Sequence, residues 1–115
     1  MNKKVYIKRN RVKYLIEIWN RNRNVLKWNP NESDEHIQMK LEICKYLRKQ
    51  GEEFYTETVF TGGKGRADIV SADRELIIEV VNSEKEKSII EKQKKYPLPI
   101  IFVDANQEFK EELIL

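Results

Sequence analysis

The chain has 115 residues, of which 36% are charged and 40% hydrophobic, and its formal net charge at pH 7 is +3. This composition indicates one folded domain with a heavily charged surface, and it excludes a membrane protein because no apolar run approaches the ~20 residues that span a bilayer. The single cysteine, Cys44, excludes an internal disulfide and a cysteine zinc site, so the expected location is the cytoplasm.

The basic charge is concentrated in residues 1–30, which carry nine Lys and Arg residues against one acid, Glu17. A basic segment attached to a more acidic body is typical of an arm that neutralises phosphates. We therefore expect nucleic-acid contacts from Lys8, Arg9 and Arg11. The alternative is a solvated basic surface that has no partner.

Two apolar stretches within this arm, Tyr14–Trp19 and Val25–Trp28, are separated by five polar residues. This pattern predicts a β-hairpin. A helix over Val12–Trp19 is the competing interpretation, because its apolar residues also fit one helical face. Tyr and Trp residues among Arg and Lys could stack on bases, but such aromatic residues more often belong to the core.

A helix is predicted from Ser33, a favourable N-cap, to about Gln50, and Gly51 is its expected stop. His36 and Lys40 lie one turn apart within its apolar face. Buried lysine is rare without a partner, so Lys40 is expected to reach a carboxylate.

Three strands are expected after this helix, joined by short turns into an antiparallel meander. A charged helix, an apolar strand and a short closing helix should follow. The expected ranges are 54–60, 66–71 and 76–81 for the meander, 83–96 for the helix, 100–103 for the last strand and 106–115 for the closing helix. Residues 1–30 and 31–115 are therefore interpreted as a basic arm and a core within one compact domain.

Two acids, Asp68 and Glu79, interrupt otherwise apolar strands. A carboxylate in such a strand is costly unless it is paired or binds a metal, so the pair suggests a divalent-cation site. Strand-edge acids that face solvent are the alternative. On the glycine-rich turn before Asp68, Lys64 and Arg66 are candidate phosphate contacts.

The order helix, three strands, helix, strand resembles the PD-(D/E)XK, or restriction-endonuclease-like, nuclease superfamily over residues 31–105. The stretch Ser33-Asp34-Glu35-His36 followed by Lys40, with Arg66-Ala67-Asp68, Glu79 and Ser83, further resembles its competence-associated nuclease-like branch. The resemblance implies an α/β (α+β) fold and a metal-dependent DNA endonuclease. It also implies that Asp68, Glu79 and the Val80 carbonyl hold Mg²⁺ or Mn²⁺, which are hard cations that prefer oxygen ligands.

One departure from the family pattern is Val81, which stands where the superfamily usually has a catalytic lysine two residues beyond the second acid. Lys40 is predicted to replace this lysine and to lie beside Asp68 or Glu79, while Lys64 and Lys92 are further candidates. His36 is expected to position the phosphate or a metal-bound water.

Two other functions are compatible with the sequence: a catalytically inactive nuclease fold that binds nucleic acid, which Val81 favours, and an interaction subunit unrelated to nucleic acid. DNA is the expected partner rather than RNA, with no membrane. A homodimer is plausible because one small domain offers one active site, whereas duplex cleavage needs two cuts.

Overall fold

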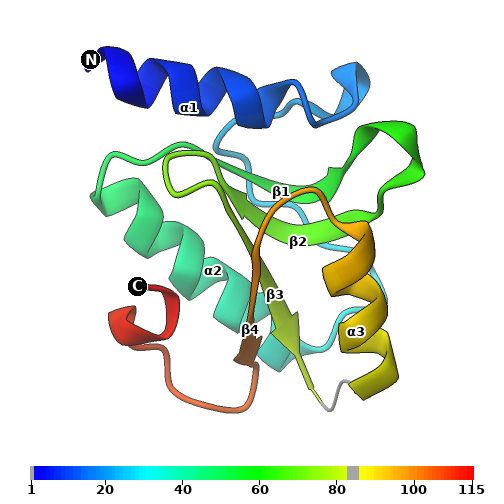
Figure 1. Ribbon diagram of the computed structural model, residues 1–115. Coiled ribbons are helices and arrows are strands. Elements are labelled where there is room, and N and C mark those ends of the chain that lie inside the picture. Colours follow the sequence, from blue (N-terminus) through cyan, green and yellow to red (C-terminus); the bar gives the residue numbers. More distant parts are fainter. Residues whose placement is uncertain (1, 83–85) are drawn as a thin grey trace.

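The computed structural model describes residues 2–82 and 86–115, and it consists of one four-stranded sheet with helices on both faces (Figure 1). In chain order the elements are α1 (Lys3–Lys13), a 3₁₀ turn (Ile18–Asn20), α2 (Asp34–Lys49), β1 (Phe54–Val59), a 3₁₀ turn (Thr61–Gly63), β2 (Arg66–Ser71), β3 (Leu76–Val81), α3 (Glu86–Lys95), β4 (Ile100–Asp104) and a 3₁₀ turn (Glu111–Ile114). The expected order of helix, three strands, helix and strand is confirmed, and with it the α/β restriction-endonuclease-like fold class.

The strands lie in the order β1-β2-β3-β4. Short turns make β1, β2 and β3 an antiparallel meander, and the crossover through α3 brings β4 parallel to β3. Ile69 of β2 pairs with Ile78 of β3, and because these strands are antiparallel, the next residues, Asp68 and Glu79, lie opposite each other.

Apolar clusters cover both faces of the sheet. On one face, Ile43 and Leu47 of α2 pack with Ile78 and Val80. On the other face, a second cluster joins α1 and the segment after it to Ile77. Figure 1 shows α1 and α2 on opposite sides of the sheet. Because successive residues of a strand point to opposite faces, Glu79 belongs to the face of Ile77 and not to the face that α2 covers.

The limits of α2 follow from its caps, as the sequence predicted. The Ser33 side chain accepts a hydrogen bond from the His36 amide at 3.2 Å, which satisfies one free donor of the first turn. After Lys49 the chain leaves the helix through Gly51, whose φ of +70° suits glycine.

The prediction of a hairpin in residues 1–30 is wrong, and so is a helix over Val12–Trp19. The helix of this segment is α1, and the residues after it run along the exposed edge of β1. The Asn24 amide donates to the Phe54 carbonyl at 2.8 Å, and the Lys27 amide donates to Thr56 Oγ1 at 2.8 Å. An edge strand presents unpaired backbone groups, and this segment satisfies them in place of pairing with itself.

Two smaller expectations also need correction. The closing helix is only the 3₁₀ turn Glu111–Ile114. The helix expected over 83–96 spans Glu86–Lys95, while residues 83–85, including Ser83 of the family-like motif, lie outside the described part of the chain. Within that described part, no helix has the length and apolar content needed to cross a membrane.

Candidate functional site

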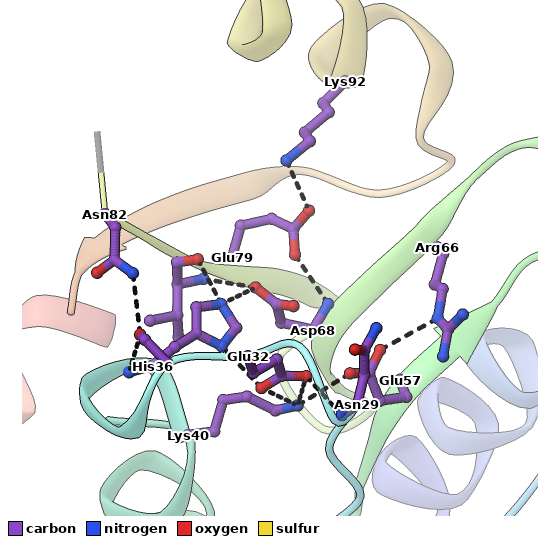
Figure 2. A network of polar contacts seen from close by, with 12 residues as sticks. Asn29, Glu32, His36, Lys40, Glu57, Arg66, Asp68, Glu79, Asn82 and Lys92 are labelled. Carbon is purple, nitrogen blue, oxygen red and sulfur yellow. Dashed lines mark hydrogen bonds and ion pairs between the residues drawn. The ribbon is translucent and has the colours of Figure 1, made fainter. Parts of the chain in front are cut away.

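Asp68 and Glu79 lie together and hold each other through the backbone, as expected from their strands (Figure 2). The Asp68 amide donates to Glu79 Oε2 at 2.8 Å, and the Val80 amide donates to Asp68 Oδ2 at 2.8 Å. Only 3% of Glu79 is exposed. The alternative of two solvent-facing acids is therefore wrong, because both carboxylates are fixed at one point between β2 and β3.

His36, from the first turn of α2, reaches this pair. Its Nε2 lies 2.8 Å from the Val80 carbonyl oxygen and 3.3 Å from Asp68 Oδ2. Its Nδ1 lies 2.8 Å from Glu32 Oε2. The hydrogen bond to Asp68 outweighs the effect of burial and raises the pKa of His36 to about 9. At neutral pH the ring is therefore a cation that bridges two carboxylates.

Lys40 is fully buried, as the helical pattern predicted, but its partners differ from those expected. Its Nζ contacts Glu32 Oε1 at 3.1 Å and Glu57 Oε1 at 3.3 Å, and it donates to the Lys27 carbonyl at 2.7 Å. The prediction that Lys40 lies beside Asp68 or Glu79 is thus wrong. The physical reason is the alternation of β3, since α2 covers the face opposite the Glu79 side chain.

The lysine beside Glu79 is Lys92 of α3, which the sequence had offered only as a lesser candidate. Its Nζ lies 3.4 Å from Glu79 Oε1, and Tyr96 Oη lies 3.2 Å from the same oxygen. Tyr96 also donates to the Arg66 carbonyl at 2.6 Å, which ties the end of α3 to the start of β2. The helix that follows β3 therefore supplies the cation that Val81 does not.

Gly65 allows this close approach. It has a φ of +109°, and a Cβ atom at this position would collide with the Tyr96 ring. The glycine-rich turn therefore lets β2 pass directly beside Tyr96, which in turn contacts Glu79.

Sequence reasoning missed two acids of the site, Glu32 and Glu57. Glu32 gave no usable signal, because it lies in the loop before α2. Glu57 could have been suspected as an acid in the alternating stretch of β1. It has a φ of +46°, a costly conformation for a non-glycine residue, and its carbonyl accepts from the buried Asn20 side chain at 3.2 Å. Its carboxylate binds Arg66 Nε at 3.1 Å as well as Lys40.

The acids of the site lie between cations, from Lys92 beside Glu79 at one end to Arg66 beside Glu57 at the other (Figure 2). Burial alone would raise the pKa of Glu32, but hydrogen bonds from Glu57, the Asn29 amide and His36 lower it to about 2. Burial and the hydrogen bond to Glu32 raise the pKa of Glu57. One carboxylate of this pair is therefore strongly ionised, while the other holds its proton more tightly.

The pKa values of the two central acids, Asp68 and Glu79, are also shifted in opposite directions. Burial would raise the pKa of Asp68, but the hydrogen bond and positive charge of His36 lower it below its usual range. Burial and the negative charge of Asp68 raise the pKa of Glu79 to about 7. Glu79 is thus an acid whose ionised form needs more positive charge nearby than Lys92 supplies.

The donor set fits a hard divalent cation. Among the described residues, no three His, Cys, Asp or Glu side chains form a ready-made metal cluster. The site offers Asp68, Glu79 and the Val80 carbonyl, all at one cleft of about 340 Å³. Mg²⁺ is commonly held by one or two carboxylates and keeps several waters, so this oxygen set suits it.

A comparison with models of protein families shows which family the chain resembles. Residues 32–103, more than half of the chain, match the family described as "Competence protein CoiA, nuclease-like domain". The chain belongs to this family. The resemblance to the competence-associated branch of the PD-(D/E)XK superfamily is thereby confirmed. No curated protein and no solved structure matched the chain.

In this CoiA nuclease-like domain, only one of the two basic residues expected on the glycine-rich turn borders the cleft. Arg66 is exposed and borders the cleft, where it pairs with Glu57. Lys64 is exposed on the turn before β2.

The basic residues expected in the arm belong to α1, which lies outside the matched residues 32–103. Arg9 binds Asp73 at 2.7 Å and Arg11 binds Glu75 at 3.2 Å, both at the β2–β3 turn. Lys8 is exposed. The structure therefore does not bring the arm residues to Asp68 and Glu79, and Arg9 and Arg11 help to hold α1 on the sheet.

Proposed function

We propose that this chain is a Mg²⁺- or Mn²⁺-dependent nuclease that hydrolyses DNA phosphodiester bonds at the cleft formed by Asp68 and Glu79. The observation that carries the proposal is the pair of carboxylates, Glu79 buried and Asp68 partly buried, fixed by reciprocal backbone hydrogen bonds with a lysine beside Glu79. Membership of a nuclease-like family supports it.

Asp68 and Glu79 are the proposed metal ligands, together with the Val80 carbonyl. When bound, the cation supplies Lewis-acid polarisation of the scissile phosphate and of the attacking water. The Val80 carbonyl now accepts from His36 at 2.8 Å, so its use as a ligand requires that ring to turn away or to share the oxygen. His36 is then free to hold a phosphate oxygen at the edge of the cleft.

Lys92 is the proposed replacement for the lysine absent at Val81. Its ammonium group lies at the carboxylate of Glu79, where it can orient the attacking water and balance charge that develops on the phosphate. Lys40 and Glu32 take a positioning role, since they fix His36 and the strand edge without reaching the two central acids.

DNA contacts are proposed for Lys64 and Arg66 on the turn that leads into β2, with Lys8 as a further contact on α1. Phosphate contacts of this kind position the substrate but carry no sequence preference. Cleavage of both strands of a duplex would require two such sites, so we propose a homodimer for that substrate.

A second candidate function is nucleic-acid binding without cleavage, and Val81 is the observation that favours it. In that case Lys92 would serve only to neutralise Glu79. The two functions differ in one measurable property, which is metal-dependent hydrolysis.

The test is incubation of plasmid and single-stranded DNA with the protein in Mg²⁺, in Mn²⁺ and in chelator. Asp68→Asn and Glu79→Gln should each abolish cleavage, and Lys92→Met should slow it by about 10²-fold, the usual scale for loss of one group that stabilises developing charge. Lys94→Met is the matched control, because Lys94 is exposed on the same helix, and it should cleave like the parent. Cleavage that persists in chelator or in Asp68→Asn would refute the proposed site.

A further inference from the structure

A second pocket, of about 570 Å³, lies beside the candidate cleft, between the N-terminal segment and strands β1 and β2. Its lining includes Trp19, Lys27, Trp28 and Val59. Trp19 is 69% exposed and Trp28 is 56% exposed, so the interpretation of these residues as core is wrong. They are the two tryptophans of the chain, and both lie at one pocket.

Hydrogen bonds to the core hold the backbone that carries the two tryptophans. The Lys27 amide donates to Thr56 Oγ1 at 2.8 Å, and the Lys27 carbonyl accepts from the buried Lys40 at 2.7 Å. The Asn20 side chain accepts from the Val59 amide at 2.6 Å. The indole rings therefore project from a fixed frame, which lowers the entropy cost of binding a flat ligand.

The pocket adjoins the cleft, because Glu57 and Arg66 line both. We infer that the pocket binds an unstacked base of a single-stranded nucleic acid whose backbone passes Arg66 into the cleft. The inference rests on the proposed nuclease function and adds the form of the substrate. Aromatic side chains bind bases of single strands by stacking, whereas the bases of an intact duplex are already stacked and have no free face.

Charge favours this occupant over a second copy of the chain. At the pocket itself Lys27 and Arg66 outnumber the one acid, Glu57, so two copies facing each other there would bring like charges together. Lys27 and Arg66 at the pocket suit the phosphates on either side of a bound base. The volume is within the range of ~300–1,000 Å³ that is typical of ligand pockets.

The experiment is a fluorescence titration in chelator, which prevents cleavage. Because both tryptophans line the pocket, intrinsic fluorescence reports directly on its occupancy. The probes are oligothymidylate, oligouridylate and a DNA duplex of the same length. The single strands should quench the fluorescence with saturation and the duplex should not, and the ratio of the two single-strand affinities distinguishes DNA from RNA.

Variants identify the stacking residues. By anisotropy with labelled oligothymidylate, Trp19→Ala and Trp28→Ala should each weaken binding by about 5- to 150-fold, the usual range for loss of one stacked base. Trp28→Phe should retain most of the affinity. The salt dependence of the affinity should stay unchanged in all three, because no phosphate contact is removed. Tyr14→Ala is the control, since Tyr14 is an exposed aromatic outside this pocket and should bind like the parent.

The outcomes separate this inference from the proposed function. Asp68→Asn should still bind oligothymidylate. If the parent protein shows saturable quenching but no cleavage with Mg²⁺ or Mn²⁺, the pocket is supported and the nuclease proposal is refuted. Cleavage with no loss of affinity in either alanine variant overturns the pocket and leaves the nuclease standing. Equal quenching by duplex, or self-association that depends on the tryptophans while oligonucleotides have no effect, also overturns the pocket.

Discussion

Replacing Lys40 with methionine is expected to destabilise the fold far more than it affects any single chemical step. Lys40 is 0% exposed, and its ammonium group is held by Glu32, Glu57 and the Lys27 carbonyl. Methionine keeps the length of the side chain but leaves two carboxylates close together without their shared cation.

The expected cost is about 3–5 kcal/mol in the free energy of unfolding, the usual result when one partner of a buried ion pair is removed. For a domain of this size, 1 kcal/mol shifts the melting temperature by roughly 4 °C, so the expected loss is about 12–20 °C. Total stabilities of about 5–15 kcal/mol make this a large fraction of the whole.

The assay is thermal and urea unfolding followed by circular dichroism. Lys45→Met is the matched control, because Lys45 is on the same helix but half exposed and 3.8 Å from Glu42, and its loss should cost less than about 0.5 kcal/mol. The triple variant Lys40→Met, Glu32→Gln, Glu57→Gln should recover part of the loss, since it removes the unpaired charges. A melting temperature of Lys40→Met equal to that of Lys45→Met would refute the structural role.

Three further predictions concern the frame of the site. Asn20→Ala removes a buried amide that satisfies two backbone groups of β1, and in urea unfolding it should cost about 2–3 kcal/mol; a normal midpoint would contradict this. Burial acts to raise the pKa of Asp73, but hydrogen bonds from Arg9 and from the Glu53 amide lower it overall. The ionised Asp73 therefore stabilises the fold above its unfolded pKa of about 3.9, and this stabilisation is lost as the pH falls through the lower pKa of the folded state. Arg9→Met should therefore lower the melting temperature at pH 7 and lose less than the parent on acidification to pH ~3, and parallel acid profiles would be evidence against the pair. Burial raises the pKa of Cys44 to about 12, so a thiol reagent should modify it only in denaturant, and rapid labelling of the native protein would show that the residue is accessible.

The sequence by itself determined the features that depend on neighbours along the chain. The N-cap at Ser33, the stop at Gly51 and the alternation of the strands predicted the core elements and their order. The acids Asp68 and Glu79 could be paired because a short turn places their strands side by side. The position of Lys40 within an apolar helix face was enough to predict that it would be buried against a carboxylate.

Only the tertiary structure decided which carboxylates Lys40 contacts. The choice between Glu79 and the Glu32–Glu57 pair depends on the face of β3 that α2 covers, and no local pattern records that packing. The lysine at Glu79 comes instead from α3, and Tyr96, the residue that follows this helix, packs with the cluster of Ile77.

The tertiary structure also decided the form of the N-terminal segment. Its two apolar stretches suit a hairpin in isolation, but the free edge of β1 offers better-placed backbone partners than the segment has within itself. Pairing with that edge leaves Trp19 and Trp28 exposed beside the cleft. Sequence periodicity predicts which residues are apolar, whereas contacts between distant parts of the chain decide which of them water can reach.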